Sequence, residues 1–143
     1  MIGVILSILS GLCMSLQGVF NSRLSEKIGL LETNVFVQGT AFLLSSIILI
    51  IAGKHNFKNI KGVNKIYLLG GVLAVIIIYT VMKGISSLGT TYAISAILIS
   101  QLITAGVIDA FGLFGAKKIN FGTNEILGVI IMLAGILIFK WKS

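Results

Sequence analysis

Long apolar runs alternate with short polar stretches along the whole chain. A run of about 17 to 20 mostly apolar residues is long enough to cross the hydrocarbon core of a bilayer as an α-helix. Five runs are predicted to span in this way: residues 2–24, 35–52, 66–82, 90–108 and 125–139. No proline occurs to break these helices. The pattern therefore predicts an all-α integral membrane protein, built as a single five-helix domain over residues 1–143.

Composition excludes an ordinary soluble domain. Hydrophobic residues make up 57% of the 143 positions and charged residues only 10%, and the mean hydropathy is +1.10. A soluble domain carries about a quarter charged residues. The net charge of +7 comes from lysines that lie mostly between the apolar runs. This placement indicates contact with the cytoplasm or lipid headgroups and argues against a nucleic-acid partner.

Five spans place the two ends of the chain on opposite sides of the membrane. The side of the N-terminus then receives six cations, namely Lys54, Lys58, Lys61, Lys65, Lys117 and Lys118. The other side receives five, namely Arg23, Lys27, Lys83, Lys140 and Lys142. A chain with one fixed orientation normally carries a clear excess on its cytoplasmic side. The near balance favours insertion in both orientations and an antiparallel pair of copies. The alternative is one orientation, set by the four lysines between the second and third spans.

Polar side chains recur at helical spacing inside the spans. The first span carries Ser7, Ser10, Met14, Gln17 and Asn21. Steps of three and four residues place them on one helix face. Asn34, Gln38 and Ser45 do the same in the second span, and Gln101 adds an amide to the fourth. Such amides either bond across helices and hold the bundle together, or line a wet cavity for a small solute. The candidate cavity residues are Ser10, Met14, Gln17, Asn21, Gln38 and Gln101.

Asp109 is the one carboxylate within the long apolar stretch that contains the fourth span. A helix from Thr90 to Ile108 already rises about 30 Å, so Asp109 is expected at the membrane interface. It then begins an interfacial turn that leads to Lys117 and Lys118. The favoured interpretation is structural, with the carboxylate capping backbone amides or pairing with a lysine. The other interpretation is a proton-carrying role, because acids within spans often mark function.

Signatures of catalysis and of metal binding are not found. The sequence has no paired-histidine motif, no phosphate-binding glycine loop and no nucleophile beside a base. The single cysteine, Cys13, excludes an internal disulfide. We therefore expect no enzyme, no metal site and no cofactor.

Two stretches resemble a known family. "LQGVFNSRLSEKIG", from Leu16 to Gly29, has a glutamine, an asparagine four residues later and then a leucine. "SQLITAGVIDAFGLFG", from Ser100 to Gly115, has a Gln-Leu pair, an aspartate eight residues after that glutamine, and Phe-Gly; "GVIIMLAGILI" follows. Both resemble the YdcZ-type family of small bacterial membrane proteins, in the drug/metabolite transporter (DMT) superfamily. The likeness covers nearly the whole chain at the level of its five apolar segments.

The resemblance implies transport of a small metabolite or drug-like solute across the bacterial inner membrane. It also implies dimers of five-helix chains, formed by two antiparallel copies or with a paired partner, and it does not imply a particular substrate. The residues to which it points are Gln17, Asn21, Gln101, Asp109, Phe111 and Gly112. The small multidrug exporters, more distant relatives, carry a glutamate midway along the first helix, whereas residues 2–24 contain no acid. Proton exchange by that route is not expected, and Asp109 is the candidate if coupling exists.

Two functional hypotheses follow. The first is a small-solute transporter that works as a dual-topology antiparallel homodimer by alternating access, with a polar cavity at the bilayer midplane. The second is a non-transporting membrane scaffold or regulatory subunit that packs against another membrane protein. Water-accessible positions along the first helix favour the first hypothesis, and a dry interior with single-sided insertion favours the second.

Overall fold

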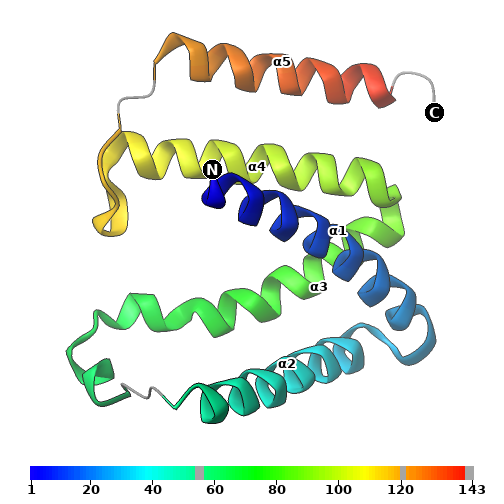
Figure 1. Cartoon of the computed structure of the whole chain (residues 1–143). Helices are drawn as coiled ribbons and strands as arrows, with labels where there is room; N and C mark the ends of the chain where they lie inside the picture. The colour runs from blue at the N-terminus through cyan, green and yellow to red at the C-terminus, as the bar shows by residue number, and fades with distance from the viewer. Residues whose placement is uncertain (54–56, 120–121, 141–143) are drawn as a thin grey trace. The chain divides into compact units, whose positions relative to one another are not determined.

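The described part of the chain is helical, in line with the predicted class (Figure 1). The structure is a computed structural model that describes residues 1–53, 57–119 and 122–140, with the backbone alone at positions 58, 139 and 140. Its α-helices are α1 (Ile2–Ile28), α2 (Leu30–Ala52), α3 (Gly70–Leu88), α4 (Thr90–Phe111) and α5 (Thr123–Lys140). Short 3-10 helices are η1 (Phe57–Gly62), η2 (Lys65–Leu69) and η3 (Leu113–Gly115). The all-α, five-helix class predicted from the sequence is confirmed.

Four helical stretches of the described chain are long and apolar enough to cross a membrane. They are α1, α2, the stretch Lys65–Leu88 formed by η2 and α3, and α4. The described apolar part of α5, Thr123–Ile138, is shorter. Large apolar side chains cover the outer surfaces of these helices and are exposed in the single chain. A helix keeps its backbone hydrogen bonds inside itself, so such surfaces can face lipid directly.

Single glycines, rather than polar loops, connect two pairs of helices. The expected loop over residues 25–34 is helical except at Gly29, which separates α1 from α2. Its φ of 98° and ψ of 158° lie in a region reserved essentially for glycine. Gly89, with φ 79° and ψ 161°, separates α3 from α4 in the same way. Turns were predicted where polarity rises, whereas the chain turns at glycines that can adopt a positive φ.

Three predicted helix ends are confirmed, at Ile2, Ala52 and Thr90, and the other ends shift by some residues. The first span continues past residue 24 to Ile28, and the second begins at Leu30 instead of residue 35. The third ends at Leu88 instead of residue 82, and its first residues, up to Leu69, are 3-10 helix. The fourth continues from residue 108 to Phe111, and the fifth covers Thr123–Lys140 instead of residues 125–139. The side chains of Lys54, Lys58, Lys140 and Lys142, which entered the charge count, lie outside the described residues.

The chain forms two compact units, Met1–Ser87 and Leu88–Ser143. In the first unit α1 and α2 form an antiparallel hairpin (Figure 1), and α3 contributes the buried side chains of Met82 and Ile85. In the second unit α4 packs along α5. The single five-helix domain expected from the sequence stays a prediction.

Candidate functional site

Buried polar side chains of the first unit gather beside the Gly29 turn. We call them the turn cluster, and its members are Asn21, Ser22, Thr33 and Asn34. The Asn34 side chain is 4% exposed, and its Nδ2 donates a hydrogen bond to the carbonyl oxygen of Val75 at 2.8 Å. The fully buried Thr33 donates from Oγ1 to the carbonyl oxygen of Gly29 at 2.7 Å. Thr33 therefore bonds to the hairpin turn, and Asn34 ties α2 to α3.

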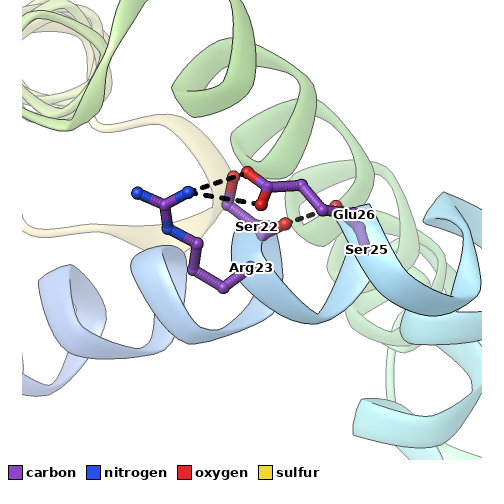
Figure 2. A network of polar contacts seen from close by, with 4 residues as sticks. All are labelled: Ser22, Arg23, Ser25 and Glu26. Carbon is purple, nitrogen blue, oxygen red and sulfur yellow. Dashed lines mark hydrogen bonds and ion pairs between the residues drawn. The ribbon is translucent and has the colours of Figure 1, made fainter.

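An ion pair joins two charged side chains near the end of α1 that leads into the Gly29 turn (Figure 2). Arg23 Nη1 lies 3.2 Å from Glu26 Oε2, one helical turn further along α1. Ser25 Oγ donates to the carbonyl oxygen of Ser22 at 2.7 Å in the same turn. The ion pair is largely exposed and contributes only a few tenths of a kcal/mol. Glu32 lies in the first turn of α2, where a carboxylate is favoured by the helix dipole. This end of the hairpin is suited to the membrane surface.

Gly18 of α1 lies against side chains of α3. A Cβ atom at Gly18 would lie 2.9 Å from Ile85 Cδ1 and 3.3 Å from Val81 Cγ1. Small residues allow helices in lipid to approach closely and gain van der Waals contact. At Gly11, earlier on the same helix, a Cβ would meet nothing within 4 Å. Of these two glycines, only Gly18 therefore lies in contact with α3.

The other predicted cavity residues face outward from their own helices. Ser10, Met14 and Gln17 are exposed on α1, and Met14 keeps 47% of its surface. Gln38 on α2 is half-buried, and Gln101 on α4 is exposed. Within the described residues, none of these three glutamine amides has a hydrogen-bond partner. The structure thus places Asn21 in the turn cluster and leaves the remaining candidates on helix surfaces.

The depth of each polar position on α1 follows from the helical rise of 1.5 Å per residue. With Ile2 at one edge of a core about 30 Å thick, Gln17 lies about 22 Å deep and Asn21 about 28 Å deep. Ser10 and Met14 then lie near the midplane. The polar face of α1 therefore runs from the midplane to the opposite boundary, where it meets the turn cluster.

Asp109 lies in the last turn of α4 and is half-buried. The helix ends three residues later than predicted, at Phe111, and is followed by Gly112, whose φ of 62° is left-handed and whose amide donates to the Ile108 carbonyl oxygen. The backbone carbonyl of Asp109 accepts from the amide of Ile119 at 2.9 Å. Its carboxylate forms no ion pair with a lysine of the described residues. The contact that holds the following turn thus comes from the Asp109 backbone and not from its side chain.

Sequence reasoning missed two members of the turn cluster, Ser22 and Thr33. Thr33 lay in the stretch taken as a loop, and Ser22 lay inside the first span but off the polar face that was followed along it. The available signal was the glycine itself, because Thr33 follows Gly29 by one helical turn. Among the described residues, no three His, Cys, Asp or Glu side chains lie together as a metal site requires.

The arrangement of apolar spans with outward polar faces can now be set beside known proteins. Residues 2–138 match the family DMT_YdcZ, described as "Putative inner membrane exporter, YdcZ". The chain belongs to this family. No curated protein and no solved structure matches it. The chain is therefore a multi-pass inner-membrane protein of an exporter family, as the two motif stretches predicted. Its role is membrane transport, which is not an enzymatic class.

Proposed function

We propose that the chain exports a small, neutral or weakly charged solute as an antiparallel dual-topology homodimer that alternates access. The exposed amides of Gln17 and Gln101 carry this proposal. Both lie on spanning helices and have no hydrogen-bond partner within the described chain. An unsatisfied amide facing hydrocarbon costs several kcal/mol. These amides therefore need a water-filled cavity or a second chain, and a dimer with a central cavity supplies both.

The chemistry of the α1 face favours a neutral solute. Ser10 and Gln17 offer hydrogen-bond donors and acceptors, and Met14 between them offers an adaptable apolar contact. The 18 residues from Ile2 to Val19 include no ionisable carboxylate or amine side chain. A cation would therefore find no counter-charge at this depth. Two antiparallel copies would bring two such faces to one midplane cavity, as in inverted-repeat transporters.

The orientation of the chain tests the antiparallel dimer. In a Cys13→Ala background, Lys61→Cys places one thiol at an exposed position between the second and third spans. Intact cells are labelled with a membrane-impermeant thiol reagent, before and after permeabilisation. We expect about half of the population to react from outside. Lys27→Cys, at the opposite end of the spans, should give the complementary fraction. Labelling from one side only would exclude the antiparallel homodimer.

Water accessibility tests the cavity. Ser10 and Leu9 are neighbouring, exposed residues that lie on different faces of α1. Each is replaced by cysteine in a separate variant. We expect a water-soluble methanethiosulfonate reagent to modify the thiol at position 10 and not the one at position 9. Protection at both positions would favour the scaffold hypothesis.

We also expect Gln17→Leu to abolish solute binding and to preserve the dimer. Loss of the dimer would show that this amide holds helices together.

A further inference from the structure

Helices α4 and α5 form an open apolar groove of about 270 Å³ within the second unit. Gly106, Ala110 and Phe111 contribute from α4, and Ile126 and Ile130 contribute from α5. All the side chains that line it are apolar. In a bilayer such a groove cannot stay empty, because its walls would lose dispersion contacts. Its occupant is either lipid or another protein helix.

The length of the groove favours lipid. On α4 its lining runs from Ile103 to Phe111, which corresponds to a rise of about 12 Å. One leaflet of the hydrocarbon core is about 15 Å deep. The groove is thus confined to one leaflet and reaches the end of α4. A helix from a second copy would make a seam along most of the span, whereas the upper part of an acyl chain needs only this depth.

Two lysines follow at the end of α4 where the groove finishes. Gly112 turns the chain with a left-handed φ of 62° directly after Phe111. The chain then folds back, so that Lys118 Cβ lies 3.4 Å from the position that a Cβ on Gly112 would occupy. The hydrogen bond from the Ile119 amide to the Asp109 carbonyl fixes this return. Lys117 and Lys118 are therefore held beside the helix end that borders the groove.

Both lysines are exposed, and neither forms an ion pair with a described acid. Two carboxylates belong to the same end of this unit: Asp109, half-buried in the last turn of α4, and Glu125 in the first turn of α5, whose Oε2 accepts from the Gly122 amide. Neither carboxylate forms an ion pair with Lys117 or Lys118 among the described residues, so both ammonium groups can meet an anion. A lysine ammonium binds a phosphate as a compact point charge, and basic clusters at the bilayer surface attract anionic lipids.

We propose that the α4–α5 groove and the Lys117–Lys118 pair together bind one anionic phospholipid. Its acyl chain fills the groove, and its phosphate lies against the two ammonium groups. This site lies in one unit of one chain, and its existence does not depend on transport or on the orientation of the copies.

Native mass spectrometry of the purified full chain tests the site, with phosphatidylglycerol and phosphatidylcholine of the same acyl chains as probes. We expect phosphatidylglycerol to be retained and phosphatidylcholine to be lost. The Lys117→Gln/Lys118→Gln variant should bind phosphatidylglycerol roughly 25-fold more weakly, from about one factor of five per lysine. The Lys61→Gln/Lys65→Gln variant removes the same charge from two other exposed lysines and should bind as the wild type does.

A groove-filling variant tests the acyl-chain half of the site. Ala110→Phe should displace the lipid and leave the oligomeric state, read in the same spectra, unchanged. Ile130→Phe, at a position 54% exposed on the groove wall, repeats this test if the first variant fails to fold. Equal retention of both lipids, or equal weakening by both lysine pairs, would overturn the proposal. A change of oligomeric state in the groove variants would also overturn it, because a second copy would then be the occupant.

Discussion

Substitution of Gly18 by alanine probes the contact of α1 with α3 most directly. The added Cβ would lie 2.9 Å from Ile85 Cδ1, which is closer than such atoms approach, and 3.3 Å from Val81 Cγ1. The struck atom is the end of the Ile85 side chain, which is only 7% exposed, so this side chain must shift to admit the methyl group. Overpacking of this kind costs about 1–3 kcal/mol. Alanine also favours the helix by up to about 1 kcal/mol over glycine, which offsets part of the cost.

A double-mutant cycle removes that offset from the measurement. Ile85→Val deletes the Cδ1 atom that the new methyl would strike, at a cost of about 0.5–1.5 kcal/mol by itself. In the Gly18→Ala/Ile85→Val double variant the clash is absent. The two changes should therefore be less destabilising together than their sum, by about 1 kcal/mol. The helix preference of alanine appears in both arms of the cycle and cancels.

The free energy of unfolding, measured by sodium dodecyl sulfate titration of the purified protein in mixed micelles, reports this coupling. Gly11→Ala is the matched control, since its Cβ would meet nothing within 4 Å. It should be neutral or slightly stabilising and should couple to Ile85→Val by less than about 0.5 kcal/mol. Equal coupling of Gly11 and Gly18 to Ile85, or none for either, would refute the packing of α1 on α3 around Gly18.

Four further substitutions test the turns, the turn cluster and the start of α5. Gly29→Ala and Gly89→Ala should each destabilise the fold by about 1–3 kcal/mol in the same titration, because both glycines have a positive φ that is strained for alanine. Asn34→Leu removes the hydrogen bond to the α3 carbonyl and should cost about 1 kcal/mol in unfolding free energy. Glu125→Ala removes the 2.8 Å bond that the Gly122 amide donates to Glu125 Oε2, so hydrogen exchange at that amide should accelerate several-fold, with a loss of about 0.5–1 kcal/mol.

The spans were predictable because their signal is length and apolarity, and each spanning helix satisfies its own backbone. The turns were not predictable in this way, because a rise in polarity was taken as the sign of a turn. Gly29 and Gly89 connect their helices with one residue each. Nothing in a hydropathy pattern distinguishes such a glycine from Gly11 or Gly39, which lie inside helices. The distinction depends on tertiary packing around the turn, as at the buried Thr33.

The candidate site was predictable in part. Helical periodicity correctly placed Ser10, Met14 and Gln17 together on α1, because a step of three or four residues fixes the face. It did not separate these exposed residues from Asn21, which continues the same face and is buried. Burial of Asn21 depends on the neighbouring α2 and α3, whose approach is set by Gly29 and by the close packing at Gly18. A pattern along one helix contains no information about that approach.

The one-residue connections constrain how the chain is made as well as how it packs. A ribosome-bound chain commonly presents its first helix to the membrane before the second has emerged. Here a single glycine joins α1 to α2, so neither helix can settle at its final depth while the other stays in water. The charged residues Arg23, Glu26 and Glu32 lie at the shared end of both helices, so they stay on one side of the membrane as a unit. The orientation of one helix in the bilayer therefore fixes the orientation of the other.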